Sequence, residues 1–496
     1  MFARNRFLVS IGPRMSAVWS YLLGIDTPRS KRWLRLHAVL LSVVALAALI
    51  LFWHFAMFTA HVMNNDPQHP KKNHDQTIYL EHASFLKHRG ASYIVPRQHM
   101  PGYGALLVPF MRHGEGIWQF FWRSKTLAVV LSVLALAGLA AVWRLVFPWT
   151  ETVLFSAAAG FLLYVFRAGY FQPELIFCGL FLLCLVLVLK MLVKPGWMLA
   201  IAAGAAFVAT HMFKSSTLPA LALFLFASAV RIVPLVSRSE WPQVLRQGAM
   251  ALTVPLVFCA LLSPYLRTSK KLFGSYFFSA HTRYHMWVDT HDESRALVGM
   301  RLGAQAPTFD DAVLSQAKDY DQARPFFEKW QRSGLPGPSR YFAEHSWQNI
   351  GERFLDSADR QFDRIKRDYR GLVRFLQGLF GAALAVLVIN FSEARRLFAR
   401  FWLPICTYAA VMAGYFVAYA FYAKIGMGPR LFLTLAMPLV FGLAMMVWAL
   451  GREMRIPFTS FDLSFRKLAN WALVAVLANS AFRGLTDHIY WVPGGQ

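Results

Sequence analysis

Long apolar stretches alternate with short charged connectors over most of this chain. A helix that crosses the roughly 30 Å hydrocarbon core of a bilayer needs roughly 20 apolar residues, and the pattern offers about eleven such stretches. They cover residues 36–62, 126–147, 150–166, 174–193, 197–213, 216–236, 249–264, 373–391, 402–423, 431–450 and 468–485. The pattern therefore predicts an all-α polytopic membrane protein with about eleven transmembrane helices.

Basic residues are concentrated in the short connectors between these stretches. They are dense before residue 36 and within 190–194, 231–246, 395–400 and 452–467. Cytoplasmic loops of membrane proteins are enriched in Lys and Arg, so we expect the N-terminus and these connectors in the cytoplasm. The long loops 64–125 and 265–372 then face the opposite side, which is the periplasm if the protein belongs to a bacterial inner membrane.

The same pattern divides the chain into four parts. Residues 1–35 form a cytoplasmic basic tail, and residues 36–264 form an N-terminal module of seven transmembrane helices that includes the first external loop, 64–125. Residues 265–372 form the second external loop, and residues 373–496 form a C-terminal module of four helices. In the second loop Phe354, Phe362 and Ile365 recur at helical spacing, which predicts short helices in a small cap on the membrane surface.

The composition is typical of a membrane protein and indicates which kinds of partner to expect. Hydrophobic residues make up 56% of the chain and charged residues only 16%, against about 25% charged in soluble domains. The net charge of +25 comes largely from residues that flank apolar stretches, which favours anionic lipid headgroups over nucleic acid. The acidic run 289–293 is dense in oxygen ligands and could bind a divalent metal, but such runs are typical of solvated surface. No cofactor is therefore expected, with a divalent metal as the alternative.

One candidate catalytic group lies in the first external loop. If a helix begins at Asp75, its spacing puts Asp75, Tyr79 and His82 on one face, where a carboxylate can take a proton from a hydroxyl near the lipid boundary. The alternative is that Asp75 only caps the helix, which is the usual role of an Asp at that position.

Further candidates are ionisable or polar groups near the expected outer helix ends. They are Arg97 and Tyr103 in the stretch 97–104, Arg167 with Glu174, Lys214 beside His211, and Arg430. Charged groups close to a bilayer are costly to hold, which makes them candidates for function. Each one taken alone is also typical of an anchor whose charged head reaches the interface. If the cations converge, they would form a site for a phosphate group.

The order of these landmarks resembles the GT-C superfamily of membrane glycosyltransferases. The resemblance is carried by Asp75, Tyr79 and Ala83 in the first loop, and then by the stretch 97–103. It continues with Lys214 after the fifth apolar stretch and with the sequence Ser-Pro-Tyr-Leu-Arg at 263–267. The similarity is greatest to the branch that includes protein O-mannosyltransferases and the aminoarabinose transferases of lipid A.

This resemblance implies an inverting glycosyltransferase at the outer face of the membrane. Its donor would be a sugar on a polyprenyl phosphate, and its acceptor a glycolipid such as lipopolysaccharide, a polysaccharide or a protein of the cell envelope. Asp75 would be the general base, while Arg97, Lys214 and Arg430 would bind the leaving phosphate, with Tyr79, His82, Tyr103, Arg167 and Glu174 around the substrate. Gln76 replaces the family's usual second acidic residue, so a metal-independent enzyme is expected.

Two other classes of protein share some of these features. A ligase or polymerase of O-antigen type acts on similar substrates, but it usually carries its large external loop late in the chain. A transporter or flippase of lipid-linked sugars would favour charges deep within helices and internal repeats. Few such charges and no such repeats are evident here. A membrane scaffold without activity would need no such group of polar residues at one level.

Overall fold

The computed structural model describes residues 31–63, 74–89, 100–165, 167–273, 276, 346–368, 370–421, 430–451, 470, 472–475 and 479. Every regular element within these ranges is a helix. In order they are α2 (Lys31–Phe58), η1 (Thr59–Met63), α4 (His74–Arg89), α5 (Gly102–Leu107), η3 (Val108–Phe110), α6 (Ile117–Arg123), α7 (Lys125–Arg144), α8 (Trp149–Ala159), η4 (Gly160–Tyr164), α9 (Glu174–Val193), α10 (Trp197–Phe213), η5 (Ser215–Thr217), α11 (Leu218–Ser237), α12 (Trp241–Phe273), α18 (Trp347–Asp368), α19 (Arg370–Ile389), α20 (Phe391–Phe421) and α21 (Arg430–Leu450).

Seven helices of the described part are long and apolar enough to cross a membrane. They are Ser42–Val62, Lys125–Arg144, Glu174–Val193, Ser215–Ser237, Trp241–Thr268, Arg370–Ile389 and Phe391–Ala418, with two shorter apolar helices, Trp197–Phe213 and Thr434–Leu450. Large apolar side chains such as Leu134, Phe226 and Val388 are exposed on these helices, which suits a lipid environment. The predicted all-α, membrane-embedded class is confirmed, and the last predicted span, 468–485, lies largely outside the described residues.

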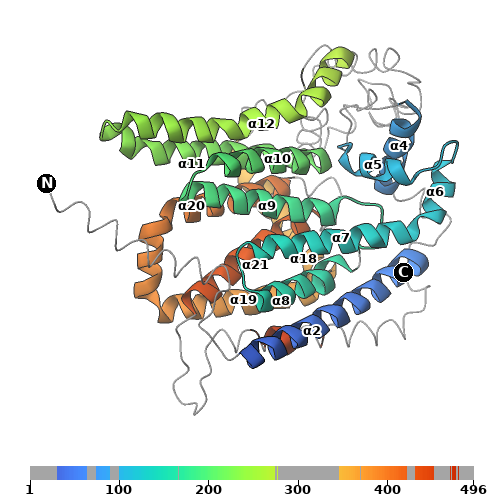
Figure 1. The fold of residues 1–496 in the computed structure, drawn as a ribbon, viewed down its shortest axis with the longest axis horizontal. Helices are drawn as coiled ribbons and strands as arrows, with labels where there is room; N and C mark the ends of the chain where they lie inside the picture. Colours follow the sequence, from blue (N-terminus) through green and yellow to red (C-terminus); the bar gives the residue numbers. More distant parts are fainter. Residues whose placement is uncertain are drawn as a thin grey trace.

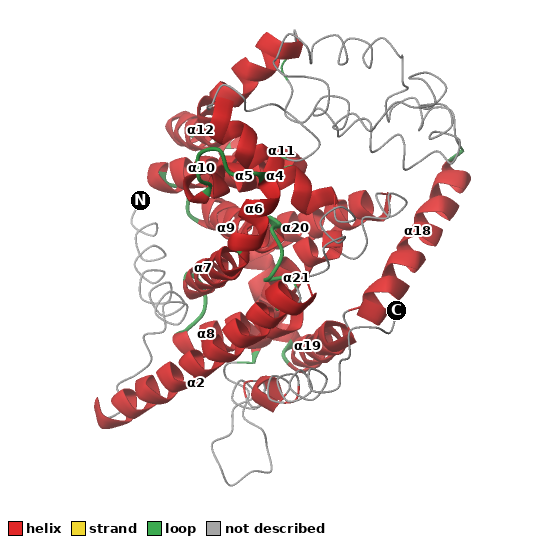
Figure 2. Cartoon of the chain, turned by 90° about the vertical axis from the view of Figure 1, so that its right-hand side faces the viewer, coloured by secondary structure: helices red, strands yellow, loops and turns green. Residues whose placement is uncertain are grey.

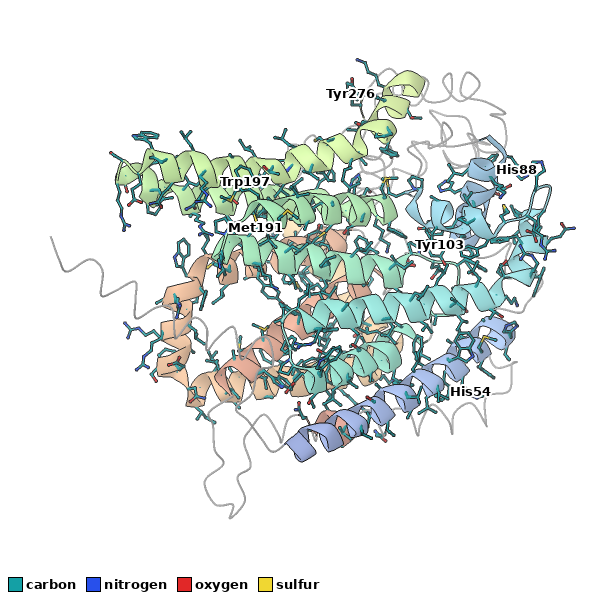
Figure 3. The ribbon with its side chains drawn as sticks, in the orientation of Figure 1. His54, His88, Tyr103, Met191, Trp197 and Tyr276 are labelled. Atoms are coloured by element: carbon teal, nitrogen blue, oxygen red, sulfur yellow. The ribbon has the colours of Figure 1, made fainter. Side chains whose placement is uncertain are left out.

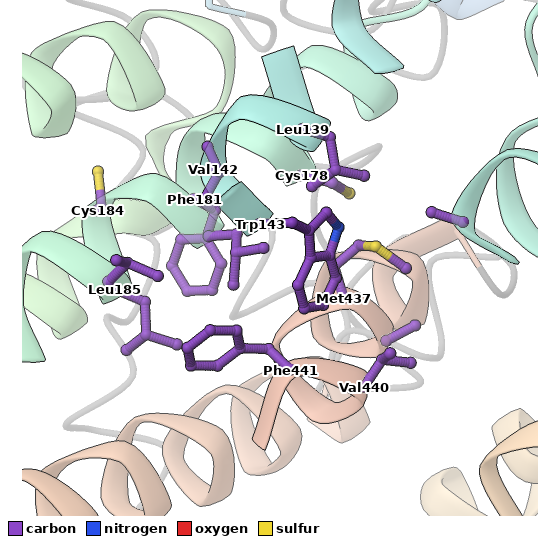
Figure 4. Close-up of a cluster of buried hydrophobic side chains, with 14 of the residues drawn as sticks. Leu139, Val142, Trp143, Cys178, Phe181, Cys184, Leu185, Met437, Val440 and Phe441 are labelled. Atoms are coloured by element: carbon purple, nitrogen blue, oxygen red, sulfur yellow. The ribbon is translucent and has the colours of Figure 1, made fainter. Parts of the chain in front are cut away.

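The centre of the bundle is α9. Its sequence is apolar on every side, which is typical of a helix buried all round, and 67% of its span is buried. It packs against α7, α10, α11, α20 and α21, and Figure 1 shows α7, α9 and α10 side by side. An aromatic cluster continues this core. The ring centroids of Trp143 on α7 and Phe441 on α21 are 5.8 Å apart (Figure 4). The ring centroids of Trp143 and Phe155 on α8 are 5.2 Å apart.

The two ends of the bundle differ in chemistry. At one end Lys190 Nζ donates a hydrogen bond to the Leu145 carbonyl at 3.2 Å, and Arg231 Nη1 donates one to the Met191 carbonyl at 3.0 Å. We call this the basic end, and we call the opposite end, which carries α4, α5 and α6, the loop end. Figure 3 labels Tyr103 at the loop end, with Met191 toward the basic end. The helices α7, α9 and α11 therefore all finish at the basic end.

Two elements differ from the sequence prediction. The helix α12 runs over Trp241–Phe273 rather than 249–264, so much of the predicted connector 231–246 is helical. A proline can kink a helix without ending it, and α12, which contains Pro255 and Pro264, bends over its last part in Figure 1. The predicted connector 395–400 is also helical, because α20 starts at Phe391 and is kinked at Phe401, where φ is −121° and ψ is 24°.

A buried carboxylate joins α8 to the C-terminal helices. Glu151 is completely buried in the first turn of α8. Its Oε1 atom accepts hydrogen bonds from Trp448 Nε1 at 3.1 Å and from Asn470 Nδ2 at 3.3 Å. A buried charge is costly unless hydrogen bonds compensate it, and the positive end of a helix dipole favours an acid at this position. Glu151 therefore links parts of the bundle that are about 300 residues apart.

Candidate functional site

Polar side chains from four segments meet at the loop end of the bundle. The segments are α4, α5, the turn 165–173 before α9, and the junction between α10 and η5. Around them lies a small apolar core of its own, which includes Tyr79, Leu80, Tyr103, Phe120 and Phe171. This core fixes the loop-end helices against the membrane bundle.

Two glycines allow α5 to dock closely. A Cβ atom on Gly104 would lie 2.5 Å from the Cβ of His82 on α4, and one on Gly102 would lie 2.5 Å from the Met212 carbonyl oxygen of α10. Real Cβ atoms do not approach so closely, so glycine is required at both positions. The Pro-Gly-Tyr-Gly sequence at 101–104 thus inserts Tyr103 between α4 and the end of α10.

Tyr103 is the residue through which α5 meets the site. Its ring is buried and packs edge-to-face on Tyr79, with the ring centroids 5.4 Å apart. Burial raises the pKa of the Tyr103 phenol well above its ordinary value, the negative charge of Glu174 raises it further, and a backbone hydrogen bond at Gln172 opposes them. The hydroxyl therefore stays protonated and lies near both Glu174 and Gln172.

Glu174 and Lys214 form an ion pair at the loop end. Lys214 Nζ lies 3.4 Å from Glu174 Oε1, with 19% of the lysine side chain and 6% of the glutamate side chain exposed. Glu174 occupies the first turn of α9 and Lys214 follows the last turn of α10, so each charge is favoured by its helix dipole. The ammonium group also lies 5.4 Å from the centre of the Phe177 ring. The result is a positive charge held at a fixed place and still reached by solvent.

The turn before α9 is held in place by three helices. Thr59 Oγ1 donates a hydrogen bond to the Val165 carbonyl at 3.3 Å, and Ser132 Oγ donates one to the Ala168 carbonyl at 2.9 Å. Gln76 Oε1, from the residue after Asp75, accepts a hydrogen bond from the Phe171 backbone N–H at 3.0 Å. This last bond connects the start of α4 directly to the turn that leads into Glu174.

Gln172 is a candidate that sequence reasoning missed. Its side chain is only 4% exposed, and neither amide atom has a hydrogen-bond partner among the described residues. Buried amides nearly always have partners, so an unsatisfied one calls for an explanation. A glutamine next to a proline before a helix carries no functional signal in one sequence. Its lack of a partner becomes visible only in the folded chain.

The structure places some of the predicted site residues together. Tyr79 and His82 are both buried on α4, on the face that meets α5. Tyr103, Glu174 and Lys214 lie in one cluster, in which Glu174 is paired with Lys214. His211 is buried beneath Lys214, where its Nδ1 atom lies 3.0 Å from Thr217 Oγ1.

Other predicted residues are placed only in part. The helix α4 begins at His74, so Asp75 lies within its first turn rather than at the capping position before it. Arg430 is the first residue of α21. The side chains of both residues, together with all of Arg97 and the acidic run 289–293, lie outside the described part. Arg167 is half-buried in the turn, where its charge opposes the effect of burial that raises the pKa of Tyr170.

A second ion pair shapes the loop between α5 and α7. Arg123 Nε lies 2.7 Å from Glu115 Oε1, and Arg123 Nη2 also donates a hydrogen bond to the Phe110 carbonyl at 2.8 Å. The hydrogen bond from Arg123 lowers the pKa of the Glu115 carboxyl from 4.5 to about 2. This bidentate pair closes the loop that carries α6.

Comparison with protein-family models and with curated proteins finds no match to this chain.

Proposed function

We propose that this protein is an inverting glycosyltransferase that moves a sugar from a polyprenyl phosphate to an acceptor at the membrane surface. The observation that carries the proposal is the Lys214–Glu174 pair beside Tyr103, at the end of the bundle where Asp75 lies in the first turn of α4. A lipid-linked phosphate in the bilayer would present its head at this level. A lysine that is held by a glutamate and partly open to solvent is suited to compensate the charge of a phosphate.

The reaction would be a single displacement at the anomeric carbon. Asp75 takes the proton from the acceptor hydroxyl as that oxygen forms its bond to the anomeric carbon. The bond from this carbon to the phosphate oxygen breaks, and polyprenyl phosphate leaves with the electron pair. Lys214 stabilises the negative charge that develops on the phosphate, while Glu174 and the turn 165–173 hold Lys214 in position.

Tyr103 and Gln172 would bind the sugar or the phosphate. A protonated phenol donates a hydrogen bond, and a carboxamide both donates and accepts, so together they match a ring of hydroxyl groups. Because the Gln172 amide has no protein partner to lose among the described residues, Gln172→Leu is expected to keep the stability of the protein. It is expected to raise the KM for the donor, since a substrate hydroxyl loses its partner.

The cellular setting is part of the same proposal. The positive-inside rule puts the basic end in the cytoplasm, so the loop end would face the periplasm of a bacterial inner membrane. The acceptor would be a glycolipid, a polysaccharide or a protein of the cell envelope, and the surrounding lipid is a further partner. Nucleotide sugars are not required, because the donor carries its activated bond on a lipid.

The test is donor cleavage by the full-length protein in liposomes. Labelled polyprenyl-phosphate sugars are supplied with an extract of envelope glycolipids, and both sugar transfer and free polyprenyl phosphate are measured. Asp75→Asn is expected to lower transfer by about 10²–10⁴-fold through loss of a general base. Lys214→Met is expected to lower it by about 10²–10³-fold, as for loss of one group that stabilises the developing charge. Lys194→Met, an exposed lysine at the basic end, is the matched control and is expected to leave transfer unchanged.

Two results would contradict the proposal. If the wild type releases no polyprenyl phosphate from any donor but moves intact donor between leaflets, the protein is a transporter of lipid-linked sugars. If transfer occurs and survives both Asp75→Asn and Lys214→Met, the reaction takes place elsewhere in the chain.

A further inference from the structure

The helix α18 carries one apolar stripe along its length. At about 100° per residue, six large apolar side chains fall on one side of α18, and its acidic and basic residues, except Asp368, fall on the other. The six are Trp347, Ile350, Phe354, Leu355, Phe362 and Ile365. Such a helix needs a partner for the whole of its apolar stripe.

One edge of this stripe is covered by the protein. Ile350 and Ile365 are buried at 5% and 3% exposure, and α18 packs on α19 and α20. The Phe354 ring meets Phe416 of α20 edge-to-face, with 6.3 Å between the ring centroids. These contacts fix α18 against the membrane-crossing helices.

The other edge of the stripe is uncovered. Trp347 is 79% exposed, Leu355 66% and Phe362 46%. This uncovered edge continues the exposed apolar surface of α20 at Phe416 and Val417. That surface belongs to a helix long and apolar enough to cross a membrane, so lipid covers it.

The position of α18 places the uncovered edge at the level of the bilayer surface. A single residue separates Asp368 from Arg370, where the membrane-crossing helix α19 begins. Figure 2, which looks along the direction in which α7, α9 and α10 run in Figure 1, shows α18 at full length along one side of the bundle. Its axis thus runs across the direction of the spanning helices, as a helix lying on a membrane does.

We propose that α18 lies in the lipid–water interface, with Trp347, Leu355 and Phe362 inserted among the lipid acyl chains just below the headgroups. Its charged side faces water and largely neutralises itself: Arg360 pairs with Asp356, and Lys366 Nζ lies 3.7 Å from Asp363. The Lys366 ammonium also lies 4.5 Å from the centre of the Phe362 ring, so its apolar stem covers part of that ring while the charge reaches the interface. The binding is therefore apolar and does not require anionic headgroups.

The experiment compares two neighbouring positions on opposite sides of α18. Spin labels are attached to Phe362→Cys or Asp363→Cys in the full-length protein, in phosphatidylcholine nanodiscs. Cys259 and Cys406 are replaced by serine because they are exposed, whereas Cys178 and Cys184 are buried. Collision of each label with oxygen, which enters lipid, and with a water-soluble nickel chelate is then measured. Leu355→Cys and Asp356→Cys form a second pair in case a variant of the first pair does not fold.

The label at Phe362 is expected to collide severalfold more with oxygen than with the chelate, and the label at Asp363 is expected to show the reverse. Adding anionic lipid is expected to leave both ratios unchanged. Equal exposure of both labels to the chelate would show that α18 stands in water and would overturn the proposal. A Phe362 label shielded from both reagents would show that a protein surface covers the stripe, which also overturns it. Neither result depends on the proposed glycosyltransferase activity.

Discussion

Removing the positive charge of the Lys214–Glu174 pair tests the loop-end site most directly. At a separation of 3.4 Å and an effective dielectric constant of about 20, the Coulomb attraction is about 5 kcal/mol. Breaking a buried pair usually costs about 3–5 kcal/mol, because the remaining charge is left uncompensated. Lys214 keeps some exposure to solvent, so we expect Lys214→Met to lower the free energy of unfolding by about 2–4 kcal/mol.

A double-mutant cycle separates this structural cost from the proposed function. Glu174→Gln removes the negative charge that loses Lys214 in Lys214→Met, so the double variant is expected to recover most of the lost stability. Unfolding in mixed micelles of mild detergent and dodecyl sulfate, followed by tryptophan fluorescence, measures the four free energies. Transfer from the lipid-linked donor is measured on the same samples.

The double variant is expected to be stable and inactive, because stability needs the charges balanced whereas the leaving phosphate needs the cation itself. A coupling energy near zero would show that the two side chains do not form a buried pair. Full activity in the stable double variant would show that Lys214 does not bind the phosphate.

Three further perturbations follow from the structure. Gly104→Ala is expected to destabilise the protein by about 1–3 kcal/mol through overpacking, while Gly138→Ala, where a Cβ meets nothing within 4 Å, is the neutral control in the same unfolding assay. Glu151→Leu is expected to cost about 1–3 kcal/mol because the buried Trp448 Nε1 and the partly buried Asn470 Nδ2 lose their acceptor. Glu151→Gln is expected to recover much of this stability, and equal losses in both variants would refute the hydrogen-bond explanation. The stabilisation that the Glu115–Arg123 ion pair contributes is expected to depend on pH. Folding lowers the pKa of Glu115 from 4.5 to about 2, so this stabilisation is present above pH 4.5 and is lost as the pH falls toward 2. The melting-temperature difference between wild type and Arg123→Met is therefore expected to be constant at neutral pH and to shrink over that acidic range; a difference independent of pH would contradict this assignment.

The sequence determined the class of protein and several helix bounds. The length of an apolar stretch that crosses the bilayer is a local property of the sequence. The predicted spans 174–193 and 197–213 therefore have the same bounds as α9 and α10. The spacing of Phe354, Phe362 and Ile365 likewise predicted the helix that α18 forms. Hydropathy was less informative where a helix extends beyond its apolar part, because charged residues also form helix. This is why the full lengths of α12 and α20 were missed.

Only the tertiary structure decided which polar residues meet. Glu174 and Lys214 are 40 residues apart: Glu174 begins α9 and Lys214 follows the end of α10. No local pattern relates them, and their pairing follows from the packing of α9 on α10. Glycines beside a proline usually indicate a turn, but Gly102 and Gly104 are needed for close contact with α10 and α4. The buried amide of Gln172 and the bonds of Glu151 depend on distant partners in the same way. Secondary structure and membrane insertion depend on short-range sequence, whereas a site depends on contacts that exist only after the helices have packed.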